Sequence, residues 1–359
     1  MTVIVLPTEL QLSCSCSSEV ETLCHHVYNA LESLMFMDYT RFFEQYQPGG
    51  LVEIATTHKK YFIITETNKS LEILPRGEIK SLYRLTDRLK LNDFPTVMCL
   101  PGGNQTPVTK MKDAALTYII IDAYKDLFPP FLLPCIGYLN KAGTEIKLFD
   151  HFITGTEKKY DRYLTEEQRT LNKLCYEMWQ LADSTNGSFF KDPVADPQKL
   201  NALLNLWQKG IAILQHETFT YLYGLYRKRE LKGKQSKQRI DRIEIKTEKP
   251  VLQFQLLDRG EIFQLQLQVI VKNRALENFS LDQMYFAREQ GSLYLFSSLK
   301  DIGLAEWFNR ANNCITVFKE HFNEFEKEIL NPLQENYLIE TIISSPLRLK
   351  KIKAQRIIK

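Results

Sequence analysis

The chain has 359 residues, of which 44% are hydrophobic and 25% charged, and its formal net charge is +3. This length favours two or three domains over one core, and the apolar content excludes a globally disordered chain. The first twelve residues, MTVIVLPTELQL, lack the basic start and apolar run of a signal peptide, and no run reaches the roughly 20 apolar residues of a membrane-spanning helix. Seven scattered cysteines indicate a reducing compartment, so we expect a cytoplasmic protein without a membrane partner.

Residues 1–156 are predicted to form a mixed α/β N-terminal domain. Apolar residues recur at helical spacing over 20–35, with Ser17 or Ser18 as the cap. The same stretch offers zinc-ligand types, namely Cys14, Cys16, Cys24, His25 and His26. Structural zinc sites usually use paired C-x2–4-C motifs, and the helical pattern instead places Cys24 on the buried face and both histidines at the surface. We therefore expect a core cysteine and no bound metal.

The rest of this domain is predicted to contain hairpins and a loop. Residues 51–74 have the pattern of short strands with a turn at 68–69, and residues 135–149 repeat it with a turn at 140–143. The glycines of CLPGGNQTP at 99–107 predict a plain turn, because G-x4-G-K-[S/T] and a dinucleotide-type glycine motif are both absent. No nucleotide or other cofactor is expected.

Residues 157–235 are predicted to form a helical domain with a basic end. Thr165 and Gln168 make a capping box for the first helix, and Asp196-Pro197 opens the second. The apolar stripes that follow are typical of core-facing helices.

A basic stretch lies at the boundary of the next domain. Residues 227–249 hold ten Lys or Arg against four acids, a charge of +6, and the last twelve residues add six cations and no acid, which leaves 3 − 6 − 6 = −9 for the rest. This asymmetry favours contact with a polyanion over generic solubility, and Tyr221, Tyr223 and Tyr226 add aromatic groups suited to nucleic acid. The alternative for this stretch is an exposed, solvated connection between two packed units. The candidate nucleic-acid-binding residues are Arg227, Lys228, Arg229, Lys232, Lys234, Lys237, Arg239, Arg242, Lys350, Lys351 and Lys353.

Residues 236–340 are predicted to form an antiparallel β-rich domain closed by a helix, followed by a basic tail at 341–359. Alternation over 252–271 with a turn at 258–260 predicts a hairpin whose glutamines face outward, and a second hairpin turns near Gly291. A final helix should carry Phe318, Phe322, Phe325 and Ile329 on one face and stop at Asn331-Pro332. The overall fold class is α+β.

No catalytic residue is predicted. His321, Glu324 and Glu328 share a flank of the last helix, but exposed acids and histidine beside an apolar stripe are typical of an ordinary surface helix. A serine nucleophile elbow, H-E-x-x-H and a Cys/His/Asn signature are all absent from the sequence.

The sequence over about 160–345 resembles the region that precedes the motor in bacterial Swi/Snf-type helicases. The hairpin-rich block VLQFQLLDRGEIFQLQLQVIVKNRALENFS, the LYLF strand, the EWF helix and the FxxFExxILxPL helix end carry the resemblance, and LTEEQRTLNKLCYEM fits it more loosely. In that family the motor consists of RecA-like lobes with a Walker A loop and an acidic box. This chain has neither motif, so no catalytic residue is carried over, and residues 1–156 lie outside the resemblance.

The resemblance and the charge pattern together imply a non-enzymatic accessory or regulatory module of a DNA-translocating helicase. Its expected partners are double-stranded DNA and a helicase motor, in the same chain or another one, with no small-molecule substrate. The alternative is a protein-interaction scaffold without a nucleic-acid role, and an enzyme in the N-terminal region is a third possibility.

Overall fold

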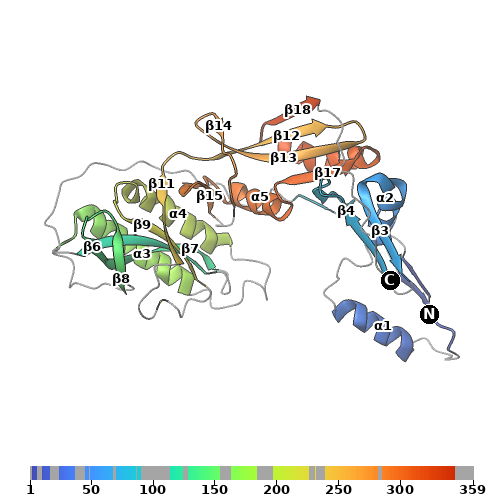
Figure 1. Ribbon diagram of the computed structural model, residues 1–359, viewed down its shortest axis with the longest axis horizontal. Helices are drawn as coiled ribbons and strands as arrows, with labels where there is room; N and C mark the ends of the chain where they lie inside the picture. The colour runs from blue at the N-terminus through green and yellow to red at the C-terminus, as the bar shows by residue number, and fades with distance from the viewer. Residues whose placement is uncertain are drawn as a thin grey trace. The chain divides into compact units, whose positions relative to one another are not determined.

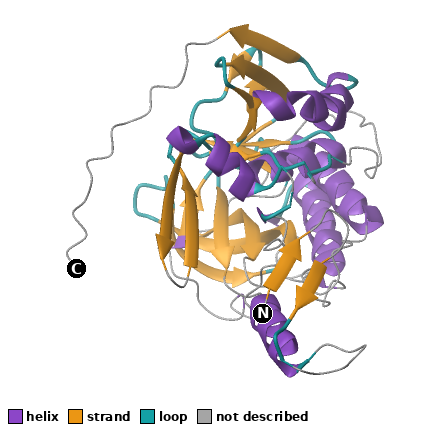
Figure 2. Ribbon diagram, turned by 90° about the vertical axis from the view of Figure 1, so that its right-hand side faces the viewer, coloured by secondary structure: helices purple, strands orange, loops and turns teal. Residues whose placement is uncertain are grey.

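The structure is a computed structural model, and it describes residues 2–5, 10–16, 24–36, 45–47, 49–67, 70–85, 87–89, 114–123, 128–153, 163–183, 197–225, 231, 239–281 and 285–343. Helices and strands are both abundant, and the sheets are antiparallel or mixed, which confirms the α+β class (Figures 1 and 2). The chain divides into two compact units. Unit 1 comprises Met1–Leu89, Gln255–Gln266 and Cys314–Lys359, and unit 2 comprises Lys90–Phe254 and Leu267–Asn313.

Both units are discontinuous in sequence, whereas the sequence analysis proposed consecutive domains. The strand pairings show the reason. β5 (Ser81–Leu82) runs parallel to β17 (Cys314–Phe318), and β9 (Thr220–Leu225) runs parallel to β6 (Ala114–Ala123). Each of these sheets therefore joins segments that lie far apart in the chain.

Unit 2 is built on a five-stranded sheet with the order β10-β9-β6-β7-β8. The remaining members are β7 (Phe128–Leu139), β8 (Ile146–Phe152) and β10 (Ile240–Arg242). The predicted turn at 140–143 is confirmed, because the backbone N–H of Gly143 donates to the Asn140 carbonyl at 2.9 Å. The central strands β6 and β7 are buried along most of their described length, as expected for strands covered on both faces.

Two helices, α3 (Glu166–Asp183) and α4 (Pro197–Leu214), pack on this sheet (Figure 1). The capping box is confirmed: the Gln168 N–H donates to Thr165 Oγ1 at 3.0 Å, and the Thr165 N–H donates to Gln168 Oε1 at 3.2 Å. The indole N–H of Trp207 donates to the Pro130 carbonyl at 2.8 Å, which ties α4 to β7. The predicted apolar stripes are confirmed as core, since most of their residues are buried.

Unit 2 also contains a three-stranded sheet and a capped helix. The sheet has the order β11-β16-β15, from β11 (Glu244–Lys246), β16 (Ser292–Leu295) and β15 (Phe286–Glu289). The predicted turn near Gly291 joins β15 to β16, with positive φ at Gln290 and Gly291. Helix α5 (Leu299–Arg310) begins at Ser298, whose hydroxyl accepts the Asp301 N–H at 3.1 Å.

The predicted hairpin over 252–271 is confirmed as β12 (Val251–Asp258) and β13 (Ile262–Val271). The two strands are neighbours in a six-stranded sheet of order β18-β12-β13-β17-β5, in which β14 (Arg274–Ala275) also pairs with β13. One expected outward glutamine is instead buried. Gln264 receives the Arg259 Nε–H at 2.8 Å and donates to Thr316 Oγ1 and the Glu78 carbonyl, both at 3.3 Å. Hydrogen bonds to these three partners offset the free-energy cost of removing the Gln264 amide from water.

Residues 51–75 hold one wrong expectation. Leu51–Thr57 forms helix α2 and not a strand, and a short 3-10 helix (Lys59–Tyr61) follows it. The predicted hairpin is confirmed as β3 (Phe62–Thr67) and β4 (Ser70–Pro75), which pair antiparallel. Its predicted turn at 68–69 lies outside the described residues. The helix is selected by packing, since Ile54 and Ala55 are buried with Phe62 and Phe318 in the core of unit 1.

The last helical segment also differs from the prediction. Phe318 ends strand β17, and the helix runs from a 3-10 turn (Lys319–His321) through α6 (Phe322–Phe325), a π-helical turn (Glu326–Leu330) and α7 (Asn331–Gln334). It does not stop at Pro332, because that proline lies in the first turn of α7, where its missing N–H is tolerated. Strand β18 (Ile339–Ile343) follows.

Candidate metal centre

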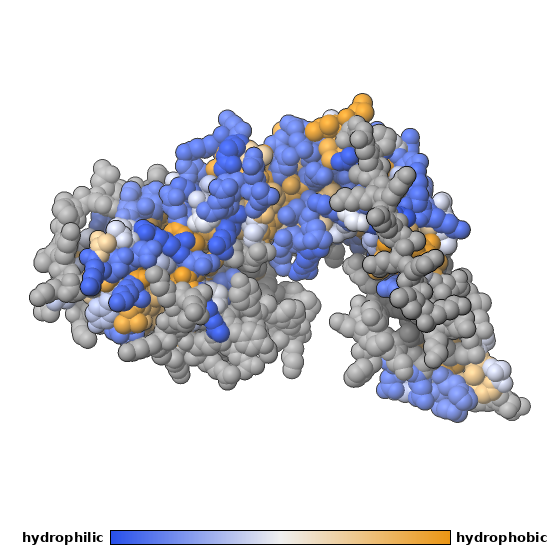
Figure 3. All heavy atoms as spheres, in the orientation of Figure 1, coloured by the Kyte–Doolittle hydropathy of each residue, from blue (hydrophilic) through white to orange (hydrophobic). Residues whose placement is uncertain are grey.

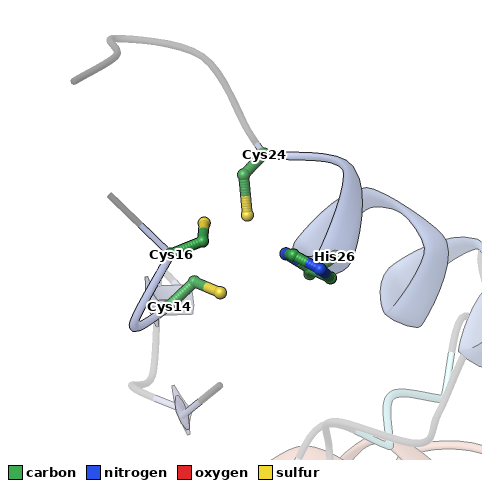
Figure 4. A group of neighbouring side chains, drawn as sticks. All are labelled: Cys14, Cys16, Cys24 and His26. Atoms are coloured by element: carbon green, nitrogen blue, oxygen red, sulfur yellow. The ribbon is translucent and has the colours of Figure 1, made fainter. Parts of the chain in front are cut away.

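Three thiols and one imidazole converge near the N-terminus of unit 1. Cys14 and Cys16 follow strand β2 (Leu10–Ser13), which pairs with β1 (Thr2–Val5), while Cys24 and His26 lie at the start of helix α1 (His25–Phe36). The four ligand atoms all lie within 4.8 Å of one another, and the side chains point toward a common centre (Figure 4).

Local backbone structure explains how each pair of ligands arises. Cys14 and Cys16 are two positions apart in the bend that directly follows the last residue of β2. Cys24 precedes α1 and its carbonyl accepts the Tyr28 N–H at 2.9 Å, so it occupies the N-cap position. His26 lies in the first turn. The sequence pattern is thus C-x-C-x7-C-x-H, two close pairs of ligands presented by two elements.

The cysteines of this cluster are not core residues. Cys14, Cys16 and Cys24 are half-buried, and His26 is exposed. Among the side chains described between residues 11 and 32, Val27 alone is buried, at 3% exposure. The expectation that Cys24 lies on the buried face of a helix is therefore wrong, because α1 begins after it and its thiol faces other ligand types.

The chemistry of this donor set fits a single tetrahedral ion. Zinc binds thiolates at about 2.3 Å and imidazole nitrogen at about 2.0–2.1 Å, which gives ligand–ligand edges of roughly 3.4–3.8 Å in a regular tetrahedron. No separation between ligand atoms in the cluster exceeds that range by more than about 1 Å, a movement within reach of side-chain rotation. Four protein ligands would complete the tetrahedron.

The protonation of the Cys14 thiol depends on whether the cluster holds an ion. The backbone N–H of Cys16 lowers the pKa of the Cys14 thiol, but hydrogen bonds with the Cys16 and Cys24 side chains and loss of hydration outweigh it, so the pKa is raised. A divalent cation reverses this by stabilising the thiolates. The N-terminal end of α1 adds a partial positive charge beside a centre that would carry a net charge of −1.

The two histidines, both expected at the surface, are exposed but differ in position. Their ring centroids lie 3.8 Å apart, yet His26 belongs to the cluster and His25 does not. This pair of neighbours therefore supplies a ligand and a matched non-ligand.

Two of the predicted nucleic-acid-binding residues are described. Arg239 is exposed just before β10. Arg242 donates to the Thr144 carbonyl at 3.1 Å and the Thr218 carbonyl at 3.3 Å, and its guanidinium lies 6.0 Å from the Phe219 ring centroid. Arg242 thus links two loops of unit 2. The other predicted residues, Arg227, Lys228, Arg229, Lys232, Lys234, Lys237, Lys350, Lys351 and Lys353, lie outside the described residues.

The tyrosines that accompany this stretch are not surface groups. Tyr221 and Tyr223 are buried in β9, and the Tyr221 hydroxyl accepts the Ile146 N–H at 3.2 Å. The expectation that they extend a nucleic-acid surface is wrong for these two residues, while Tyr226 lies outside the described residues.

The flank of the last helix carries ion pairs. Arg88 Nε lies 3.2 Å from Glu328 and its Nη1 lies 3.5 Å from Glu324, while His321 Nε2 lies 3.9 Å from Glu320. Because a cation from another segment occupies the two carboxylates, they serve as a structural contact, consistent with the expected surface helix.

The sequence shows all four residues of the cluster as zinc-ligand types, but their spacing does not match C-x2–4-C pairs, so it does not predict that they converge. The usable signal was the repetition of a one-residue spacing, C-x-C followed by C-x-H. In comparisons with known proteins, no family model, no curated protein and no solved structure matches the chain. Among the helices that the structure describes, none has the length and apolar character needed to cross a membrane.

Proposed function

We propose that this chain is a non-catalytic binding protein whose N-terminal segment holds one structural zinc ion through Cys14, Cys16, Cys24 and His26. The convergence of these four ligand atoms within 4.8 Å carries the proposal. Because four protein ligands leave no open position for water, the site suits a structural ion and not a hydrolytic one.

The segment that bears the four ligands, β1–β2 and α1, needs a further source of stability. Two-stranded hairpins such as β1–β2 are marginal in water, and helices as short as the twelve residues of α1 are marginal without packing. Among the side chains described between residues 11 and 32, one is buried, so these side chains add little apolar packing to the stability of the segment. A zinc ion bridging β2 to α1 would supply it, as metal binding supplies folding energy in small zinc domains.

The test is the metal content of the full chain, purified under reducing conditions and measured by inductively coupled plasma mass spectrometry. We expect one zinc per chain in the parent protein and in His25→Ala, and loss of zinc in His26→Ala and in Cys16→Ser. Cobalt substitution should give the thiolate charge-transfer and tetrahedral ligand-field bands of a sulfur-rich site. Zinc content that is absent from the parent, or unchanged by both ligand variants, overturns the proposal.

We also propose a nucleic-acid role, on the separate observation that charge is segregated along the sequence. Residues 227–249 and 348–359 each carry +6, and the remainder carries −9. This supports a cytoplasmic accessory module that contacts double-stranded DNA through the basic stretches, in the service of a Swi/Snf-type motor as the resemblance implies. The six cysteines described are free thiols, as suits a reducing compartment.

Salt dependence tests the nucleic-acid role. Each neutralised phosphate contributes about −0.9 to the slope of log K against log salt on duplex DNA. Replacing Arg227, Lys228, Arg229 and Lys232 with glutamine should reduce that slope and weaken binding to all sequences alike, with the melting temperature nearly unchanged. Arg310→Gln, which removes an exposed arginine outside both basic stretches, is the control. If the quadruple variant binds as the parent does, or the parent does not bind, the scaffold alternative is favoured.

A further inference from the structure

Strand β18 is the outermost strand of the six-stranded sheet, with β12 as its neighbour (Figure 1). Its other edge has no strand partner among the residues that the structure describes. Apolar side chains are exposed on the strand and next to it: Ile342 is 38% and Ile343 is 89% exposed, and Leu338, just before the strand, is 60% exposed. Figure 3 shows hydrophobic atoms gathered at the end of this strand.

Within residues 339–343 the strand carries few of the features that usually protect a sheet edge. Natural edge strands are commonly guarded by lysine or proline, and residues 339–343, IETII, contain neither. Three of the five residues are isoleucine, a strong strand former, and Glu340 is the single charged residue. An edge of this composition favours pairing with another strand.

We propose that β18 is a self-association surface, on which a second copy of this chain pairs its own β18 antiparallel about a two-fold axis at Thr341. The proposal concerns a different surface from the zinc site and does not depend on it.

The sequence of the strand selects this axis. In a continuous sheet, opposed residues must point to the same face, so a symmetric antiparallel pair can centre on 340, 341 or 342. Centring on Glu340 sets two carboxylates opposite each other, which is destabilising. Centring on Ile342 leaves both Ile339 and Glu340 without a partner from the strand. Centring on Thr341 pairs all five residues without a like-charge contact.

The contacts in this arrangement are favourable ones. Ile339 faces Ile343 of the second copy twice, on either side of the two Thr341 side chains, and these lie on one face of the sheet. β-branched and threonine pairs each contribute roughly 0.2–1 kcal/mol across strands. An isologous contact of this kind closes as a dimer and does not propagate. Because five residues a side bury far less than the roughly 1,200 Å² of a stable interface, we expect a weak, concentration-dependent dimer.

Light scattering coupled to size-exclusion chromatography, over a dilution series of the full chain, measures the molar mass and hence the oligomeric state. The parent should shift from 42.0 kDa toward twice that mass as its concentration rises. Ile343→Lys and Thr341→Lys should each weaken dimerisation at least tenfold, because each places a lysine at the edge of the sheet. Both side chains are exposed, so the two substitutions should not disturb the folded monomer. Leu74→Lys, an equally apolar exposed site on β4, is the matched control and should dimerise as the parent does.

Cysteine cross-linking tests the register. Opposed Cα atoms in an antiparallel pair lie about 4.5–5.5 Å apart, within disulfide range. Under mild oxidation Thr341→Cys should form a covalent dimer beyond the background of the parent, whereas Glu340→Cys should not. A parent that stays monomeric at the highest soluble concentration, a dimer unaffected by both lysine variants, or stronger cross-linking at 340 than at 341 would each overturn the proposal.

Discussion

If the cluster binds zinc as proposed, removing its ligands should unfold β2 and α1 locally and leave the rest of the chain folded. The perturbation is the double variant Cys16→Ser with Cys24→Ser, which takes one thiolate from each side of the cluster. Serine is close in size to cysteine, and both thiols are half-buried, so the change removes ligands with little effect on packing.

The magnitude follows from what else holds this segment. Val27 is the one buried side chain described between residues 11 and 32, and its burial contributes about 1.5–3 kcal/mol before the entropy cost of ordering α1. Counting the described side chains alone, the free energy of local opening without metal is near zero. A ligand at about 1,000 times its Kd adds about 4.1 kcal/mol to the state that binds it, which is about a thousandfold change in the open population.

Hydrogen exchange measured by mass spectrometry on the full chain provides the assay. Peptides covering α1 should lose about three orders of magnitude of protection in the double variant or after chelation. Peptides covering β12 and β13 should not change, and His25→Ala should match the parent. Equal protection of α1 with and without zinc would refute the reasoning, and so would loss of protection in β12 and β13, which would show that the ion supports the whole chain.

The remaining predictions concern the packed units. Trp207→Ala should lower the free energy of unfolding by about 3–5 kcal/mol in urea titrations, because it empties a fully buried site and leaves the Pro130 carbonyl without its donor; a loss below about 1 kcal/mol would contradict this packing. Hydrogen bonds from Arg274, at 2.5 and 3.0 Å, and from the Glu277 N–H lower the pKa of the buried Glu289 carboxyl. The stabilisation from the Glu289–Arg274 ion pair is present above the carboxyl's usual pKa and is lost as the pH falls through the lowered pKa. Glu289→Gln should therefore lower the free energy of unfolding by roughly 1–3 kcal/mol near neutral pH and flatten the acid side of the curve of stability against pH. A variant whose acid side runs parallel to that of the parent would argue against this ion pair. Gly137→Ala should destabilise unit 2 by about 1–3 kcal/mol in the same titrations, because its Cβ would lie 2.5 Å from Ile146 Cγ2, and an unchanged midpoint would show that β8 can move aside.

The sequence by itself determined features whose interactions are local. The capping box of Thr165 and Gln168 is closed by two hydrogen bonds three residues apart, and the turn at 258–260 is closed by the Asp258 side chain accepting the Gly260 N–H at 2.8 Å. The hairpin alternation and the helical stripes follow from periods of two and 3.6 residues. These patterns also indicate the α+β class, because the spacing of apolar residues in each element shows whether it is a helix or a strand.

Tertiary structure decided the features in which one sequence pattern allows two outcomes. Leu51–Thr57 has apolar spacing compatible with a short strand, and its burial against Phe318, more than 250 residues away, selects the helix. Gln264 follows the polar half of an alternating pattern, yet partners from Glu78 and Thr316 allow it to be buried.

The candidate metal centre depends on the same distinction. The types of its four ligands are visible in the sequence, but helical periodicity over 20–35 made a core cysteine the simpler interpretation of Cys24. What the periodicity does not contain is where α1 begins and that its first turn lies beside the end of β2. Cys16 and Cys24 are eight positions apart in the chain, and their ligand atoms come within 4.8 Å only when two separate elements meet, which is a property of three-dimensional packing.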